Sequence, residues 1–225
     1  MRTRPAVLSL LTGTIVTGAI LPTSGLAQSW YLGGGLGQAW FDASAGEVER
    51  GFLIDDAFSA SGTTLDKRDT GWKGYAGYRF NRIFALEGGY VDLGNASFDT
   101  TVVAAPSGTT PAPPFGIHAS AEARGVVLSA LAHWPVSQTF SLFGKAGAFR
   151  SEAKFAEVIP ATGSTRVSVS ERRTDANFGI GLLWMVSQSV GVRVELERFK
   201  NVGRGIGGRE GRDVDFASVG LTVQF

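Results

Sequence analysis

Strict alternation of residue types is the feature that most constrains this chain. In eight segments, apolar residues occupy every second position, which is the period of a β-strand whose two faces meet different surroundings. No later stretch shows the 3.6-residue period of an amphipathic helix once the N-terminal segment is set aside. The sequence therefore predicts an all-β protein with strands near residues 30–40, 72–80, 84–91, 126–134, 140–148, 179–186, 190–197 and 216–225.

The connections between these segments alternate in length. Short turns alternate with long connections, so consecutive strands are expected to run antiparallel, with all the long loops at one end. An even number of strands then places the start of the first strand and the end of the last strand on the short-turn side. The predicted long loops span roughly residues 41–70, 94–122, 151–175 and 200–213.

The two faces of the predicted strands differ in content. Small and charged residues on one face suit a crowded barrel lumen, whereas indole rings near strand ends suit the boundaries of a membrane. The face with the tryptophans carries no charge between the strand ends. Its tryptophans are Trp30, Trp40, Trp72, Trp134 and Trp184, and the glycine-rich face carries the charges Lys73, Arg79, Glu87, Lys145, Arg193, Glu195 and Glu197.

A membrane barrel explains these faces better than a soluble one. Soluble barrels of the lipocalin type also show alternation, but an uncharged face beside a glycine-rich, charged one is unusual for them. A strand in hydrocarbon must pair every backbone amide, and a closed barrel leaves no edge unpaired. We therefore predict an eight-stranded antiparallel transmembrane up-and-down β-barrel.

Composition excludes several classes of function. The chain has 21 Lys and Arg against 20 Asp and Glu, so it carries no strong field to attract nucleic acid. It has no cysteine, which excludes disulfides, thiolate nucleophiles, cysteine-ligated zinc and iron–sulfur clusters. Its two histidines lie far apart and do not support a transition-metal site. We expect no nucleic-acid partner, metal or cofactor.

The N-terminal segment has the composition of a secretory signal peptide. Arg2 and Arg4 precede a largely apolar run over residues 6–21, and Gly25 and Ala27 supply the small residues of a cleavage site. A retained N-terminal anchor is the alternative, but the run is shorter than the ~20 residues of a membrane-spanning helix. We expect a signal peptide at residues 1–27 and a single barrel domain at residues 28–225.

Two parts of the sequence resemble a known family. Residues 71–82 (GWKGYAGYRFNR) and 85–90 (ALEGGY) resemble the second hairpin of the OmpA-type eight-stranded outer-membrane barrel. The alternating C-terminal residues resemble the signal by which the β-barrel assembly machinery recognises a last strand; they are Val219, Leu221, Val223 and Phe225. The resemblance implies an outer-membrane location, and short relatives such as the Omp25-like surface proteins of the porin family are barrels alone.

The same resemblance implies an ion pair in the lumen. Glu87 and Arg193 match a glutamate of the third strand and an arginine of the seventh that pair in the OmpA family. The family's further lysine and glutamate, which can exchange partners with that pair, correspond here to Leu131 and Leu183. Because an unpaired buried charge is costly, we expect a permanent plug with no alternative partners.

Weaker motifs leave other hypotheses open. His118 and Ser120 resemble the His-x-Ser of lipid A deacylases, but no suitable acid to hold the base stands out in the sequence. The glycines of residues 203–208 fit a dinucleotide fingerprint only formally. The charged loops fit ordinary solvation, or contact with lipopolysaccharide or a host ligand. Their acidic residues are Glu47, Glu49, Asp55 and Asp56, and their basic residues are Lys200, Arg204, Arg209 and Arg212.

These features predict a structural, surface-exposed outer-membrane protein with a plugged lumen and four extracellular loops. It is not expected to be an enzyme, and its expected partners are outer-membrane lipid, lipopolysaccharide and the assembly machinery. The alternatives are a narrow porin-like channel for small solutes and a lipid A-modifying barrel enzyme that uses His118 and Ser120.

The predicted cleavage site is testable by intact-mass spectrometry of protein taken from the outer-membrane fraction. The small residues Gly25 and Ala27 predict a mature chain that starts at Gln28. A folded protein that retains residues 1–27 would contradict the signal-peptide interpretation.

Overall fold

The computed structural model describes residues 29–42, 58–104, 114–159, 164–203 and 211–225. Within these ranges no helix is long and apolar enough to cross a bilayer. Several predictions fall on residues outside the ranges: the signal peptide, most of the glycine motif at residues 203–208, and the loop charges Glu47, Glu49, Asp55, Asp56, Arg204 and Arg209.

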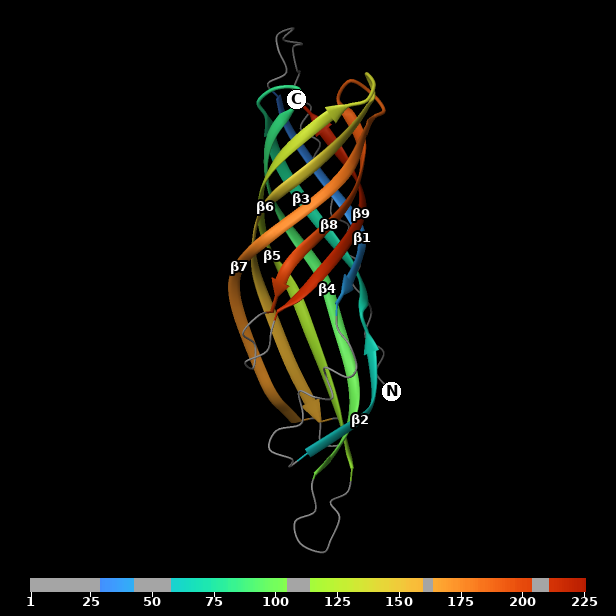
Figure 1. The fold of residues 1–225 in the computed structure, drawn as a ribbon, viewed down its shortest axis with the longest axis vertical. Coiled ribbons are helices and arrows are strands. Elements are labelled where there is room, and N and C mark those ends of the chain that lie inside the picture. Colours follow the sequence, from blue (N-terminus) through green and yellow to red (C-terminus); the bar gives the residue numbers. More distant parts are fainter. Residues whose placement is uncertain (1–28, 43–57, 105–113, 160–163, 204–210) are drawn as a thin grey trace, which may run out of the picture.

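Nine antiparallel strands form the described part of the chain (Figure 1). Their pairing order is β2-β4-β3-β1-β9-β8-β7-β6-β5, and a further pairing of β4 with β5 closes the sheet into a ring. β2 pairs with β4 beyond the end of β3. The strands are β1 (Ser29–Phe41), β2 (Phe58–Asp66), β3 (Arg68–Arg79), β4 (Phe84–Ala104), β5 (Phe115–Pro135), β6 (Phe140–Ile159), β7 (Ser164–Met185), β8 (Val190–Val202) and β9 (Arg212–Gln224).

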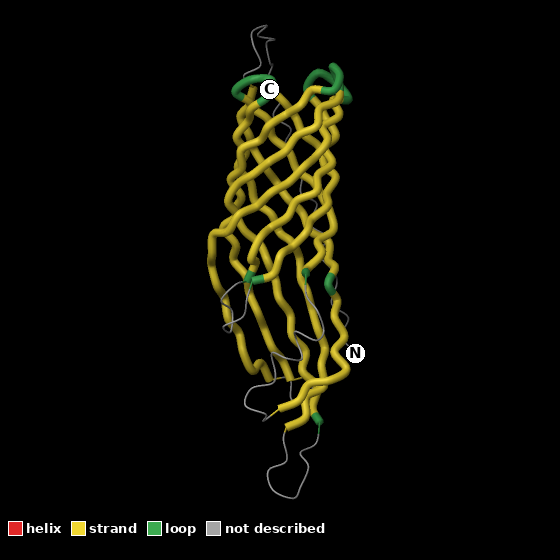
Figure 2. The backbone as a smooth tube through the Cα atoms, in the orientation of Figure 1, coloured by secondary structure: helices red, strands yellow, loops and turns green. Residues whose placement is uncertain are grey.

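The structure differs from the sequence prediction in the long connections. β2 lies inside the segment predicted as the first long loop, and β4 to β7 are 20 to 22 residues long. Most of residues 94–122 and 151–175 are therefore strand and not loop, so this part of the prediction is wrong. Figure 2 shows these strands continuing beyond the ends of β1, β8 and β9, at the end opposite the C terminus.

Two local features hide these extensions from the sequence pattern. Gly94 has a φ of 73° and lies where the register of β4 with β5 shifts, between Asp92 and Asn95. A bulge of this kind changes the phase of the alternation, so residues on either side of it no longer share one period. Farther along, outward charges such as Glu152 and Arg172 replace apolar residues, which removes the period-two signal of β6 and β7.

The interior is too crowded for a side chain at several glycines. A methyl group on Gly77 would overlap the ring of Tyr31, and one on Gly33 would overlap the ring of Tyr75. A methyl group on Gly220 would overlap the carbonyl oxygen of Gly34 on the neighbouring strand. These glycines therefore allow aromatic rings and adjacent backbones to share the narrow interior.

This crowding predicts that Gly220→Ala destabilises the barrel, because its new methyl group meets backbone that cannot rotate away. We expect a loss of about 1–3 kcal/mol in urea unfolding, as is typical of overpacking. Gly74→Ala is the matched control, because a methyl group there has no atom within 4 Å. Equal stability of the two variants would show that the interior has room to spare.

Candidate functional site

Six charged side chains meet in the middle of the ring. Each of these side chains is 8% exposed or less. They come from β3, β4, β6 and β8 and are Lys73, Glu87, Lys145, Arg193, Glu195 and Glu197, which we call the charged layer.

Arg193 and Glu87 are in direct contact across the lumen. Nη1 of Arg193 donates to Oε2 of Glu87 at 2.6 Å, and Nη2 donates to Oε1 at 3.3 Å. The hydroxyl of Tyr31 donates to the same carboxylate at 3.2 Å. A two-point guanidinium–carboxylate contact is the strong form of this interaction. The structure thus brings together the two residues that the sequence analysis paired.

The expectation that this pair has no alternative partners is wrong. Nζ of Lys145 lies 3.6 Å from Oε1 of Glu87, and Nε of Arg193 lies 2.7 Å from Oε1 of Glu195. Leu131 and Leu183 do lie in the lumen as apolar residues. Their missing charges are supplied from different strands, because the stagger of the strands brings β6 and β8 side chains to the height of Glu87.

Two lysines complete the charged layer. Nζ of Lys145 lies 3.2 Å from Glu195 and 2.5 Å from Glu197. Nζ of Lys73 donates to Glu195 at 2.6 Å and also contacts Glu197. Three cations therefore face three carboxylates, so that each buried charge has at least two partners of opposite sign. Loss of any one ion leaves the layer with one excess buried charge, which is costly.

Apolar clusters lie on both sides of the charged layer. The rings of Tyr75 and Phe143 lie 4.4 and 4.5 Å from the guanidinium carbon of Arg193, so they cover this cation with aromatic faces. The cluster nearer the short turns is Tyr31, Tyr75, Ala85, Leu131, Phe143 and Leu183. The cluster nearer the long connections is Ala39, Phe41, Val91, Leu93, Ala123, Phe149, Phe199, Val202, Val214 and Phe216.

Neutral polar groups fill part of the remaining space. Ser129 donates to the side-chain carbonyl of Asn177 at 2.9 Å, and the hydroxyls of Tyr75 and Thr222 lie 2.8 Å apart. A small cavity of about 20 Å³ adjoins Lys73 and Glu197. This volume suits about one water molecule.

Two lumen residues near the short turns have groups without partners. His133 is 4% exposed, and neither ring nitrogen has a hydrogen-bond partner among the residues that the structure describes. Arg79 is half-buried, and its Nε lacks a partner within the same ranges. The alternation placed both side chains inward, but it gave no sign that His133 would be left without a hydrogen bond.

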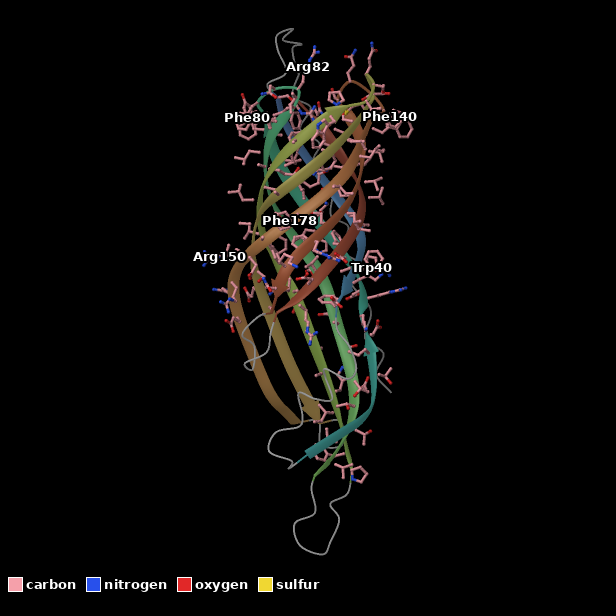
Figure 3. All side chains as sticks on the ribbon, in the orientation of Figure 1. Trp40, Phe80, Arg82, Phe140, Arg150 and Phe178 are labelled. Carbon is pink, nitrogen blue, oxygen red and sulfur yellow. The ribbon has the colours of Figure 1, made fainter. Side chains whose placement is uncertain are left out.

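The predicted interface tryptophans lie on the outer face. Trp30, Trp72, Trp134 and Trp184 are 44–62% exposed, and Trp40 is half-buried. Figure 3 places Phe80 and Phe140 near the end of the ring that holds the C terminus, whereas Trp40 and Arg150 lie about halfway along the molecule, before the extensions of β4 to β7. Trp184 stacks on Phe140 with ring centroids 5.7 Å apart.

The C-terminal strand also presents apolar side chains outward. Val219, Leu221, Val223 and Phe225 are 37–58% exposed. The backbone N–H of Phe225 donates to the carbonyl of Trp30 at 2.9 Å, so the last residue is tied to the first described strand.

The His118 motif lies on the extended part of β5. Nδ1 of His118 is 2.9 Å from Oδ1 of Asp99 on β4, so the structure supplies an acid that the sequence did not reveal. Ser120 follows two residues later on the same face, but within the described ranges no hydrogen bond joins it to His118. The base and the hydroxyl are therefore not engaged as a catalytic pair requires.

One basic loop residue is neutralised locally. Lys200 forms an ion pair with Asp213 at the rim of the ring. Partial burial opposes ionisation of this carboxyl, but the hydrogen bonds from Lys200 and from the backbone of Asn201 hold the pKa of Asp213 below its ordinary value.

Solved structures that are similar to this chain include the following three. OprG of Pseudomonas aeruginosa is 14% identical, with a TM-score of 0.52 and coverage of 89% of this chain and 97% of that one. Ail of Yersinia pestis is 16% identical, with a TM-score of 0.49 and coverage of 88% and 99%. The barrel domain of P. aeruginosa OprF is 12% identical, with a TM-score of 0.46 and coverage of 88% and 99%. No curated protein sequence matches the chain.

The family model described as the OmpA-like transmembrane domain matches residues 26–225, nearly the whole chain. The closed antiparallel ring, the outward apolar face and the inward charged layer are consistent with that match. This chain belongs to the OmpA-like transmembrane domain family, and its place is the outer membrane of a Gram-negative bacterium.

Proposed function

We propose that the protein is a structural, surface-exposed barrel whose lumen is plugged. The observation that carries this proposal is the charged layer, in which three cations and three carboxylates compensate each other between two apolar clusters. A solute that passes must separate buried ion pairs and displace packed aromatic rings, and both steps are costly. The role needs no catalytic group.

The membrane-spanning unit of this proposal is an eight-stranded barrel made of β1 and β3 to β9. β2 pairs with β4 only where β4 has passed the end of β3, so β2 belongs to the part outside the membrane. Trp30 at the start of β1 and Trp134 at the end of β5 lie at one boundary of the bilayer, and Trp40 at the end of β1 lies at the other, as aromatic girdles do. Residues 28–225 form this unit after removal of the signal peptide.

The partners follow from the outer face. Exposed apolar residues on every spanning strand contact lipid, and the last strand offers its alternating side chains to the assembly machinery: Val219, Leu221, Val223 and Phe225. β4 to β7 project from the membrane on the long-connection side, where they present the extracellular surface.

A narrow channel is the second candidate, because one observation favours it. Glu87 also contacts Lys145, and Arg193 also contacts Glu195, so the central pair could separate without leaving either ion alone. The apolar clusters on both sides weigh against an open path, since aromatic rings there would still block it.

Planar-bilayer recordings separate the two candidates. The purified protein should show no steady conductance, and an open outer-membrane porin recorded under the same conditions is the positive control. Phe143→Ala with Phe149→Ala removes one ring from each apolar cluster but keeps the charged layer, so it should stay closed as well. Heat-modifiable migration on gels checks that both proteins are folded. Steady openings of the unmodified protein would refute the plug and favour the channel.

The charged layer predicts that the stability losses caused by substitutions at Glu87 and Arg193 are strongly non-additive. Arg193→Leu alone leaves two cations against three carboxylates, and breaking a buried pair costs roughly 3–5 kcal/mol, less if water enters. Glu87→Leu with Arg193→Leu leaves two of each sign, so the double variant should recover much of the lost stability. Urea unfolding in detergent measures Arg193→Leu, Glu87→Leu and the double variant, and additive losses would show that the two residues do not act as a pair.

A further inference from the structure

A row of charges ends the apolar belt on β5, β6 and β7. On β6 the outward residues run from Phe140 to Ala148 without a charge, and Arg150 comes next. Ten residues at about 3.3 Å each, tilted by about 40°, span roughly 25 Å, which is the height of the apolar band of an outer-membrane barrel. Arg150 is therefore at the level where hydrocarbon gives way to headgroups, at the extracellular end.

Strand register surrounds Arg150 with further cations. Arg150 is opposite Val126 on β5 and Thr174 on β7. One step farther out, Glu152 is opposite both Arg124 and Arg172. Diagonal neighbours on one face of a sheet lie about 7–8 Å apart, within reach of long side chains. Arg124 and Arg172 therefore start from positions diagonal to Arg150 on the two neighbouring strands.

Arg124, Arg150, Lys154 and Arg172 form a cationic patch on the outer face, and all of them except Arg150 lie beside a carboxylate of opposite charge. Arg172 binds Glu152 at 3.1 Å, Lys154 lies 3.9 Å from the same carboxylate, and Arg124 binds Glu122 at 3.1 Å. Asp92 adds one more carboxylate opposite Arg124. Four cations thus face three acids, and Arg150 is exposed and makes no ion pair with any residue the structure describes.

We propose that this patch binds a phosphate group of the glycolipid that forms the outer leaflet. A guanidinium group matches phosphate oxygens in two-point geometry, and the site lies where such phosphates meet the acyl chains. The exposed apolar residues beside and below it, among them Val126 and Ile180, then contact the acyl chains of the same lipid. This inference rests on the membrane placement given under the proposed function.

The comparison with β8 and β9 shows why the site is local. Arg198 also lies on the outer face and is opposite Asp215, which is in turn opposite Trp40. Its Nε and Nη2 atoms both bind Asp215, at 2.6 Å each. A guanidinium group that is already bound to a carboxylate in this way attracts an anionic lipid only weakly. The β8–β9 side therefore lacks what the β5–β7 side provides.

Native mass spectrometry of the protein released from detergent tests the site. The probes are lipid A with both phosphates, lipid A without phosphates, and inorganic phosphate. Arg150→Gln should weaken binding of phosphorylated lipid A about tenfold, a loss expected for one charge-assisted contact. Arg198→Gln is the matched control and should bind as the unmodified protein does.

Four outcomes would overturn the proposal. Arg150→Gln could bind phosphorylated lipid A normally, both variants could lose the same affinity, or lipid A without phosphates could bind as well as the phosphorylated form. Binding of inorganic phosphate with equal strength would show an anion site and not a glycolipid site. Arg150→Gln should leave bilayer conductance unchanged, so failure here is distinguishable from failure of the plugged barrel.

Discussion

The need to pair every backbone amide within hydrocarbon governs the whole structure. A sheet meets that need in a bilayer only by closing on itself, and here the pairing of β4 with β5 closes it. Closure with few strands makes the ring narrow, so its interior holds side chains and not a wide water column. The glycines, the aromatic clusters and the charged layer are consequences of that narrowness.

Charged residues in so narrow a lumen need partners of opposite sign, because an unpaired buried charge is costly. Each ion of the charged layer is buried, and each has at least two partners of opposite sign. Such a network holds its strands at fixed relative heights, because β3, β4, β6 and β8 all contribute to it. The outer face follows the opposite rule, with charge excluded until the headgroup level, where Arg150 and its neighbours begin.

The alternation of the sequence predicted which side chains point into the lumen and which charges they carry. It did not predict how the strands are shifted relative to one another along the barrel axis. Alternation placed Glu87, Arg193 and the other lumen charges inward, and the structure finds all of them buried except Arg79, which is half-buried. The alternation could not show that Lys145 contacts Glu87, because no local sequence pattern determines the stagger between distant strands. The bulge at Gly94 and the polar faces of β6 and β7 similarly concealed strands that were predicted as loops. Asp99 beside His118 is a further cross-strand contact of this kind.

Solvent access to the lumen tests the central claim most directly, and the absence of cysteine from the chain makes the measurement clean. Ser129 is 2% exposed and points into the lumen, whereas Ser137 lies exposed in a short turn. A plugged barrel predicts that Ser129→Cys resists a charged, water-soluble thiol reagent in the folded protein and reacts after heat unfolding, while Ser137→Cys reacts in both states. Rapid labelling of Ser129→Cys in the folded barrel would contradict the plug and establish a water-filled path.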